Sequence, residues 1–145
     1  MPKAMEMLRL FLQIFIGTIL MASALGKALD LAGFADVLKT YQAFPESALF
    51  FIALAVTIFE FVLGAWMLGG WNLQGSAITA AVMNTTYAVW MTVTLFRGLQ
   101  LENCGCFGVF FPRPLTWFSP IEDMVMVAMC ILLAYLAQDR TEKCS

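Results

Sequence analysis

Four long apolar segments constrain the fold of this chain more than any other feature. They cover residues 8–26, 47–70, 78–96 and 120–137. Helices of these lengths, at about 1.5 Å per residue, match a hydrocarbon layer about 30 Å thick. Because lipid cannot hydrogen-bond a bare backbone, segments this apolar are expected to cross it as helices. We therefore predict an all-α fold, a bundle of four transmembrane helices that forms one domain over residues 1–145.

The composition agrees with a bilayer as the main solvent. Of the 145 residues, 61% are hydrophobic and 12% are charged, whereas a soluble domain carries about 25% charged residues. The net charge of −2 provides no basic surface, so we predict that nucleic acid is not a partner. Histidine is absent, which excludes histidine-ligated haem, a histidine-based triad and the common zinc sites, and we predict no metal.

A short amphipathic helix is predicted between the first two spans, within residues 29–44. Its apolar positions, spaced i, i+3, i+4 and i+7, are Phe34, Val37, Leu38 and Tyr41. Asp36 and Lys39 fall on the other side, a pattern typical of a helix that lies on a membrane surface or caps a bundle. Ahead of the first span, the polar start of the chain resembles that of a signal peptide, but the apolar part is longer, which favours a retained anchor.

Four crossings would place both termini on one side of the membrane and the loop after the third span on the other. Lysines and arginines are divided equally between the two sides, so the positive-inside rule does not fix the orientation. Disulfide chemistry favours the loop outside, because cytosolic thiols are kept reduced. We predict cytoplasmic termini, with the amphipathic helix and the loop on the extracytoplasmic face.

The stretch Cys104-Gly105-Cys106 in that loop is the most reactive candidate site. A disulfide between these cysteines closes a very small ring and should be strained, although Gly105 relieves part of the strain. Strained, exposed disulfides tend to be catalytic or labile, and Arg97, expected near the same end, would favour a thiolate. A static clip, two cysteines that only pack, and a half-filled two-thiolate zinc site are the alternatives.

The two remaining cysteines are separate from this pair. Cys130 lies inside an apolar segment, and Cys144 is the penultimate residue. We predict that Cys130 is a small packing residue and Cys144 a tail thiol, because buried cysteine is mostly inert.

Glu60, near the middle of the second span, is the second candidate. An ionisable side chain at this depth is costly and is functional by default. Four polar residues of the third span lie at a similar depth and could bond to it: Asn84, Thr85, Thr86 and Tyr87. One interpretation is a structural interhelical bond from a protonated glutamic acid. The other is a proton acceptor or donor beside a quinone, with Arg97, Tyr87 and Lys27 as the candidate cofactor-binding residues. Lys27 is also interpretable as an interfacial charge that snorkels to water.

The start of the last span carries a helix-capping pattern. In Ser119-Pro120-Ile121-Glu122, serine would cap the helix, proline would take its first position, and glutamate would reach back to the serine. Aromatic residues come just before it. Phe110, Phe111, Trp117 and Phe118 predict an interfacial belt or, alternatively, a surface on which a partner docks.

Taken in order, these motifs resemble the MauE/DoxX family of small redox-associated membrane proteins over nearly the whole chain. The resemblance rests on Ala24-Leu25-Gly26-Lys27, Phe59-Glu60, Arg97-Gly98 and Cys104-Gly105-Cys106-Phe107-Gly108. It implies a four-helix protein of the bacterial cytoplasmic (inner) membrane. For MauE-like members it implies a periplasmic thioredoxin-like partner during maturation of a disulfide-rich dehydrogenase subunit. For DoxX-like members it implies quinone-linked oxidation of sulfur compounds.

Residues and resemblance together predict a membrane thiol–disulfide redox relay. Cys104 and Cys106 would exchange electrons with a thioredoxin-fold periplasmic protein, and a quinone in the bundle would be the second redox group, with Glu60 as proton carrier. A non-catalytic membrane anchor or assembly factor for a periplasmic maturation complex is the main alternative, and a small-molecule transporter is a weaker one. Oxidoreductase activity follows only from the first of these. Besides the lipid bilayer, a second copy of the chain in a homo-oligomer is a further candidate partner.

Overall fold

The structure, a computed structural model, describes residues 2–144, except for the side chain of Cys144, so the predicted tail thiol lies outside the described residues. Over this range it contains five α-helices and loops, which confirms the all-α prediction. The helices are α1 (Lys3–Leu29), α2 (Leu31–Thr40), α3 (Glu46–Gly69), α4 (Leu73–Phe96) and α5 (Phe118–Cys144).

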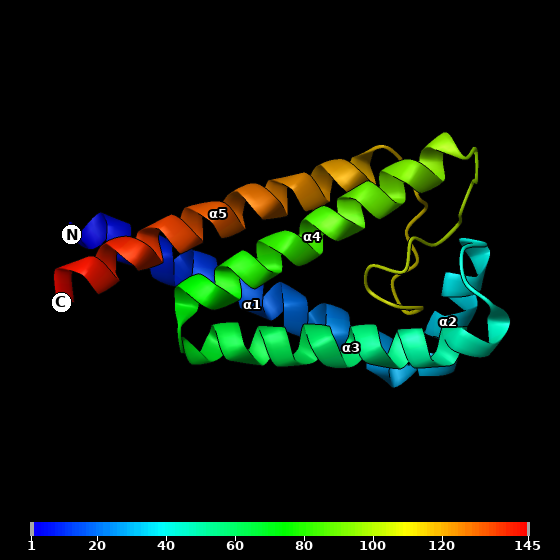
Figure 1. Cartoon of the computed structure of the whole chain (residues 1–145), viewed down its shortest axis with the longest axis horizontal. Helices are drawn as coiled ribbons and strands as arrows, with labels where there is room; N and C mark the ends of the chain where they lie inside the picture. The colour runs from blue at the N-terminus through cyan, green and yellow to red at the C-terminus, as the bar shows by residue number, and fades with distance from the viewer. Residues whose placement is uncertain (1, 145) are drawn as a thin grey trace.

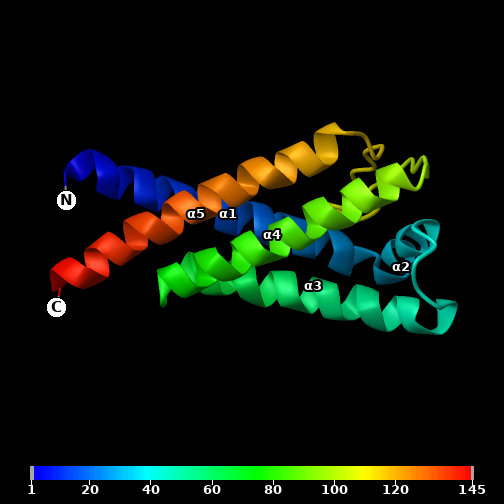
Figure 2. The same ribbon diagram turned by 45° about the horizontal axis from the view of Figure 1, so that its top comes forward.

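The four long helices run side by side along the long axis of the molecule, as Figures 1 and 2 show. Within the bundle, α4 packs mainly on α5, and α1 packs mainly on α3. The short helix α2 and the long loop between α4 and α5 lie together at one end. Both described ends of the chain lie at the opposite end. All of the predicted site residues except Glu60 and Tyr87 lie in or next to the α2 end.

Three helices in the described range are long and apolar enough to cross a membrane. They are Lys3–Leu29 (α1), Glu46–Gly69 (α3) and Phe118–Lys143 of α5. Large apolar side chains cover much of their outer surface; Phe51 and Ile131, for example, are exposed. An isolated soluble protein rarely exposes apolar surface on this scale, so these helices are those of an integral membrane protein.

Helix α4 is as long as α3 but more polar, because it contains five threonines. All five hydroxyls donate to the carbonyl oxygen four residues earlier, at 2.7–2.9 Å. These residues are Thr79, Thr85, Thr86, Thr92 and Thr94. Back-bonding of this kind satisfies a hydroxyl within its own helix. The threonine hydroxyls of α4 are therefore satisfied within the helix, although α4 is not among the three helices apolar enough to cross a membrane.

The interior is divided into two apolar clusters, one toward the chain ends and one beneath α2 and the loop. The cluster toward the chain ends includes Cys130, which is fully buried, as predicted for a packing residue. Tyr87 of α4 packs against both clusters. Glu60 and Lys27 are the two buried residues of opposite charge, so the boundary between the clusters is where polar chemistry is concentrated.

The structure confirms the amphipathic helix and corrects some helix ends. Of the four predicted apolar positions, Phe34 and Val37 in α2 and Tyr41 directly after it are buried, and Leu38 is half-buried. Helix α4 begins at Leu73 rather than at residue 78, because the side chain of Asn72 accepts a hydrogen bond from the Gly75 backbone N–H and starts the helix earlier.

The predicted capping box does not form at the start of α5. The helix already begins at Phe118, which places Ser119 inside the first turn, where its N–H donates to the Thr116 carbonyl. Glu122 does not reach back to the serine. Its carboxylate instead pairs with Arg113 at 2.7 Å, so an arginine in the loop removes the glutamate from the cap.

Candidate functional site

The loop that carries the cysteines has a defined shape. The Cys104 N–H donates to the Arg113 carbonyl at 2.8 Å, which closes the loop on itself. The Asn103 side chain accepts from the Gly105 N–H at 2.9 Å and donates to the Gly108 carbonyl at 3.2 Å. The Cys-Gly-Cys stretch is therefore fixed by hydrogen bonds within the loop on both sides.

The loop is seated on the end of α1 through backbone contact. A Cβ added to Gly108 would lie 2.5 Å from the Gly26 carbonyl oxygen, and a Cβ added to Gly26 would collide with the Phe107 carbonyl. Only glycine permits this approach from either side. Nearby, the Ser23 hydroxyl lies 2.6 Å from the Cys106 carbonyl oxygen. Two motifs that are 80 residues apart in the sequence thus form one contact.

The two loop cysteines are adjacent free thiols. Their sulfur atoms share a hydrogen bond at 2.8 Å, and Gly105 between them has φ +79°. A disulfide bond joins sulfurs at about 2.05 Å, so closure of the pair requires a movement of less than an ångström. Cys104 is only 9% exposed. The pair is thus positioned to open and close as a redox couple in a largely covered site.

The two thiols differ in acidity. A hydrogen bond from the Cys106 thiol lowers the pKa of Cys104 to about 6, with burial opposing the shift and the positive charge of Arg113 assisting it. The same hydrogen bond and burial raise the pKa of Cys106. Near neutral pH, Cys104 is therefore the thiolate and Cys106 the thiol that stabilises it. A single thiolate beside its own proton donor is the arrangement of a nucleophilic cysteine with a resolving partner.

Arg97 lies at the predicted end of the bundle, but its side chain is bonded to backbone there. Its guanidinium donates to the carbonyl oxygens of Tyr41, at 2.8 Å, and Gln42, at 3.2 Å. The cation that acts on Cys104 is Arg113. The sequence places Arg97 at the correct end of the bundle, but the loop of about 20 residues carries Arg113 closer to the sulfur.

The acidity of Cys104 predicts an unusual pH profile for alkylation of the reduced protein. Because the thiolate is the reactive form, the rate should rise through a midpoint near pH 6 and reach a plateau above it, whereas an ordinary thiol would titrate near pH 9. Removal of the hydrogen-bond donor in Cys106→Ala should move the midpoint up toward that ordinary value. Iodoacetamide kinetics followed by mass spectrometry would measure both, and equal midpoints in the two proteins would contradict this assignment.

Beneath the cysteine loop lies a buried ion pair. The Lys27 ammonium of α1 contacts both carboxylate oxygens of Glu60 of α3, at 2.7 and 2.6 Å, and the two side chains are 3% and 1% exposed. Lys27 thus points into the protein and does not snorkel to an interface. Glu60 therefore has a cation as a partner in addition to any interhelical hydrogen bond.

Further donors complete the shell around the ion pair. The Tyr87 hydroxyl donates to Glu60 at 2.6 Å, one of the four contacts predicted from similar depth. Ser23 lies within hydrogen-bond distance of Glu60, Lys27 and the Cys106 carbonyl, and its single proton can serve one acceptor at a time. Additional bonds of this kind are what make a buried ion pair tolerable, because desolvation of two charges is costly. Ser23 connects the ion pair to the cysteine loop.

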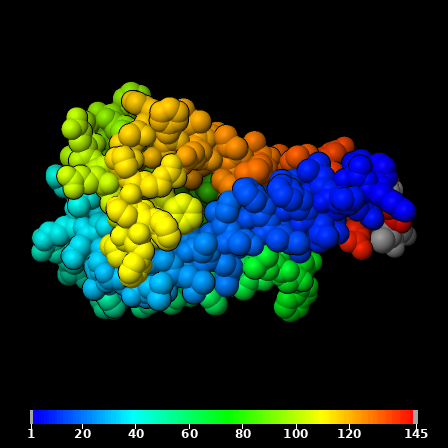
Figure 3. Space-filling view, turned by 180° about the vertical axis from the view of Figure 1, so that it is seen from behind, coloured from blue at the N-terminus to red at the C-terminus, as the bar shows by residue number. Residues whose placement is uncertain are grey.

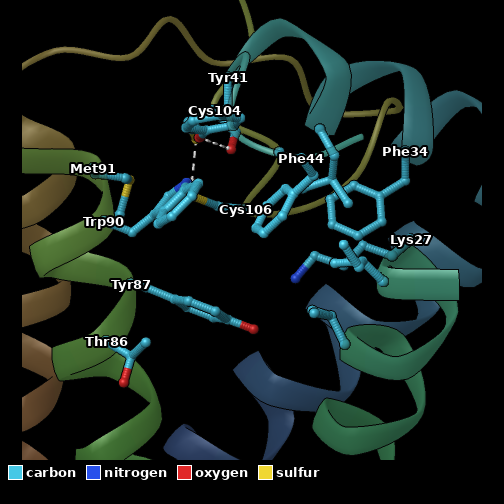
Figure 4. A pocket seen from close by; sticks show the side chains of 14 residues that line it. Lys27, Phe34, Tyr41, Phe44, Thr86, Tyr87, Trp90, Met91, Cys104 and Cys106 are labelled. Atoms are coloured by element: carbon cyan, nitrogen blue, oxygen red, sulfur yellow. Dashed lines mark hydrogen bonds between the residues drawn. The ribbon is translucent and has the colours of Figure 1, made fainter. Parts of the chain in front are cut away.

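A cavity of about 220 Å³ lies between these groups. Figure 4 shows Lys27, Tyr87, Cys104 and Cys106 around it, together with aromatic side chains. Those aromatic residues are Phe34, Tyr41, Phe44 and Trp90, and the rings of Phe44 and Trp90 stack at 5.2 Å. The cavity brings together four of the six predicted site residues. Glu60 reaches it through Lys27 and Tyr87, and Arg97 is not among the residues that line it.

Several site residues escaped prediction. Ser23 lies one helical turn before Lys27 on the same face of α1, a spacing that could have indicated it. Tyr41 was predicted only as an apolar position; its hydroxyl donates to the Cys104 carbonyl at 2.5 Å, and burial raises its pKa, which keeps it a donor. Among the described residues, no cluster of three or more potential metal ligands occurs.

Comparison with known proteins identifies the family of the chain. The family model described as methylamine utilisation protein MauE matches residues 5–136. The chain belongs to the MauE family. A curated relative, methylamine utilization protein MauE from Paracoccus denitrificans, is 24% identical over 123 residues, which are 85% of this chain and 66% of that protein. The chain thus matches slightly less than two thirds of the length of this MauE relative. No solved structure matches the chain.

Proposed function

We propose that this MauE-family protein is a thiol–disulfide relay of the bacterial cytoplasmic membrane, in which Cys104 and Cys106 exchange a disulfide with a thioredoxin-fold protein of the periplasm. One observation carries the proposal: two free cysteine sulfur atoms lie 2.8 Å apart. The lowered pKa of Cys104 and the raised pKa of Cys106 are consistent with a nucleophile and a resolving thiol. A thiolate attacks disulfides and a neighbouring thiol resolves the mixed disulfide. A purely structural pair has no need of such asymmetry.

Exchange would begin at Cys104. Its thiolate attacks one sulfur of the partner's disulfide, a Cys104–partner disulfide forms, and the partner's other sulfur leaves as a thiolate. Cys106 then gives up its proton and attacks the Cys104 sulfur, which closes the Cys104–Cys106 disulfide and releases the partner. The protein loses two electrons and the partner gains them. In the opposite direction the same steps run backwards, so both directions pass through a mixed disulfide at Cys104.

The proposed orientation has α4 as a fourth membrane span, both termini in the cytoplasm and the cysteine loop in the periplasm. The length of α4 and its back-bonded threonines support a crossing beside α5. The described chain ends lie together at the end of the bundle opposite the loop (Figure 1). An oxidising compartment is where a disulfide pair is expected, which selects the periplasm for the loop.

The cavity beside the pair fits a quinone ring as the second redox group. Phe44 and Trp90 contribute aromatic surface to the cavity wall, and the Lys27 ammonium and the Tyr87 hydroxyl are polar groups on the same wall. Both now donate to Glu60, so either would have to turn from Glu60 to donate to a carbonyl oxygen of the ring.

In the direction that oxidises the partner, the partner's thiols first reduce the Cys104–Cys106 disulfide, and a bound quinone would supply the acceptor for the two electrons released when the pair closes again. Because Cys104 is the thiolate, closing releases one proton, from Cys106, and the second proton that the quinone needs comes from solvent. The remaining task of the protein is then to hold the ring and manage protons.

Glu60 is the proposed proton carrier. Its carboxylate contacts Lys27 and Tyr87, which both line the cavity. A proton released at either of these groups can pass to Glu60 without crossing lipid. When it carries no proton, the carboxylate accepts hydrogen bonds from the Lys27 ammonium and the Tyr87 hydroxyl and keeps both oriented. A titratable group buried among fixed donors is common at functional sites.

The physiological setting is proposed from family membership. The name of the Paracoccus denitrificans relative ties that protein to methylamine utilisation, and we extend the same setting to this chain. The alternative role, a non-catalytic anchor or assembly factor in such a system, would not require either cysteine to exchange. The two roles therefore differ in one observable, the mixed disulfide.

A trapping experiment tests the relay. In Cys106→Ser the resolving thiol is removed, so a thioredoxin-fold partner should accumulate as a mixed disulfide on Cys104 after acid quenching, visible as a reducible band in diagonal electrophoresis. Cys104→Ser is the matched control and should accumulate far less, because the acidic sulfur is gone. If neither variant traps a partner and the double serine variant supports full function in cells, the relay is wrong and the assembly role remains.

A further inference from the structure

The Cys-Gly-Cys stretch lies against α2. Phe34 and Val37 of α2 pack directly on the glycine between the cysteines, since a Cβ added to Gly105 would lie 3.0 Å from Val37 and 3.2 Å from Phe34. Tyr41, at the end of α2, donates its hydroxyl to the Cys104 carbonyl. Figure 3 shows the loop, in yellow, lying against α1, in blue, and α2, in cyan. The cavity of about 220 Å³ admits a small molecule but not a folded protein.

A second set of contacts fastens the end of α2. The Arg97 guanidinium, at the end of α4, donates to the carbonyl oxygens of Tyr41 and Gln42, which immediately follow α2. Hydrogen bonds from a charged donor are stronger than neutral ones. The segment that follows α2 is thus fastened twice. Arg97 ties it to the end of α4, and the Tyr41 hydroxyl ties it to the cysteine loop.

The backbone is non-helical on both sides of α2, at Asp30 and at Gln42. Asp30, between α1 and α2, has φ −144° and ψ 78°, outside helical geometry, and its side chain caps α2 by accepting from the Gly33 N–H. After α2, Gln42 has φ +52°, a conformation that non-glycine residues adopt at a cost. The α2 helix is therefore a separate ten-residue element, and release of its end would relax Gln42.

We propose that α2 is a gate over the Cys104–Cys106 pair, latched by Arg97 and the Tyr41 hydroxyl, and that the soluble partner reaches Cys104 only when α2 lifts. This rests on the proposed function, because it explains how a folded thioredoxin-fold protein reaches a sulfur that is 9% exposed. The apolar face of α2 need not enter water on opening, since an amphipathic helix at this position can lay that face on the membrane surface. The gate keeps the pair from reacting with thiols other than those of a partner that engages it.

Size-selective thiol labelling tests the gate. We expect a small methanethiosulfonate reagent to reach the reduced pair readily in the wild-type protein and a maleimide carried on a 5 kDa polyethylene glycol chain, about the size of a small protein domain, to react slowly. In Arg97→Gln the ratio of the large-reagent rate to the small-reagent rate should rise by about tenfold or more, the effect of about 1.4 kcal/mol on an opening equilibrium.

Lys39→Gln is the matched control. Lys39 is the other cation that ties the α2 region to a neighbouring helix, through Glu46, but that ion pair is exposed and should contribute little. An unchanged ratio in Lys39→Gln together with a raised ratio in Arg97→Gln supports the latch. Equal ratios in the two variants would overturn it.

Amide hydrogen exchange on a second variant distinguishes local opening of α2 from a general loss of structure. Tyr41→Phe removes only the bond to Cys104 and should, like Arg97→Gln, speed amide exchange in α2 while α3 and α5 stay protected. Acceleration of all helices together in both variants would overturn the gate. Neither measurement uses a partner, so a gate that fails here is distinguishable from a relay that fails to trap one.

Discussion

Replacement of Lys27 with methionine is expected to destabilise the protein by about 3–5 kcal/mol, the usual cost of breaking a buried ion pair from one side. The change leaves the Glu60 carboxylate, which is 1% exposed, with hydrogen bonds from Tyr87 and Ser23 but no cation. Glu60→Gln should cost a similar amount, because it leaves a buried ammonium without its counter-charge. Denaturant unfolding of the purified protein in detergent micelles would give both values.

The double variant Lys27→Met/Glu60→Leu separates stability from function. Two apolar side chains of similar volume should restore most of the lost stability, because neither charge then has to be desolvated. We expect the restored protein to remain unable to reoxidise its cysteine pair at the wild-type rate, since the proposed proton carrier is gone. A double variant that is both stable and fully active would show that the ion pair is structural. Lys143→Met, which breaks an exposed pair with Asp139, is the control and should change stability little.

Local patterns account for what the sequence predicted well. The apolar runs, the spacing of Phe34, Val37 and Tyr41 and the depth of Glu60 and Tyr87 are all properties of single segments. Because the rise and period of a helix are fixed, such a pattern gives both the face of the helix that is buried and the depth of each residue along its axis. Depth therefore predicted a group of four possible partners for Glu60, and only the packing of α4 against α3 selects Tyr87 from it.

The pairing of Lys27 with Glu60 needed more information. Lys27 lies at the end of α1, where a lysine commonly reaches water, and only the rotation of α1 against α3 turns it inward. The exchange of Arg97 for Arg113 at the thiolate has a similar origin. Between Arg97 and Phe118 the chain has no periodic pattern, so its path is set by scattered bonds, such as that from the Cys104 N–H to the Arg113 carbonyl, which composition does not reveal.

Gly26→Ala is expected to displace the cysteine loop, although the same substitution in most helices would be favourable. Alanine is about 1 kcal/mol better than glycine inside a helix. Here, however, the new methyl group would meet the Phe107 backbone carbonyl, and backbone cannot rotate away as a side chain can. We expect a net loss of about 1–3 kcal/mol, typical of overpacking, together with loss of the Ser23 contact to the Cys106 carbonyl.

The reactivity of Cys104 should be more sensitive to this displacement than the free energy of unfolding. If α1 holds the loop, Gly26→Ala should alter the pH midpoint of Cys104 alkylation, because the geometry that lowers its pKa depends on the seating of the loop. Gly69→Ala, where an added Cβ meets nothing within 4 Å, isolates the general effect of alanine and should leave the midpoint unchanged. Gly98→Ala is a second control, because Gly98 has a positive φ but an added Cβ would meet nothing there, so the variant shows the effect of backbone strain alone. A Gly26→Ala protein that matches Gly69→Ala in stability and midpoint would mean that the loop does not depend on close backbone contact with α1. Close backbone contact would then not explain why glycine occupies position 26 in α1 and position 108 in the loop.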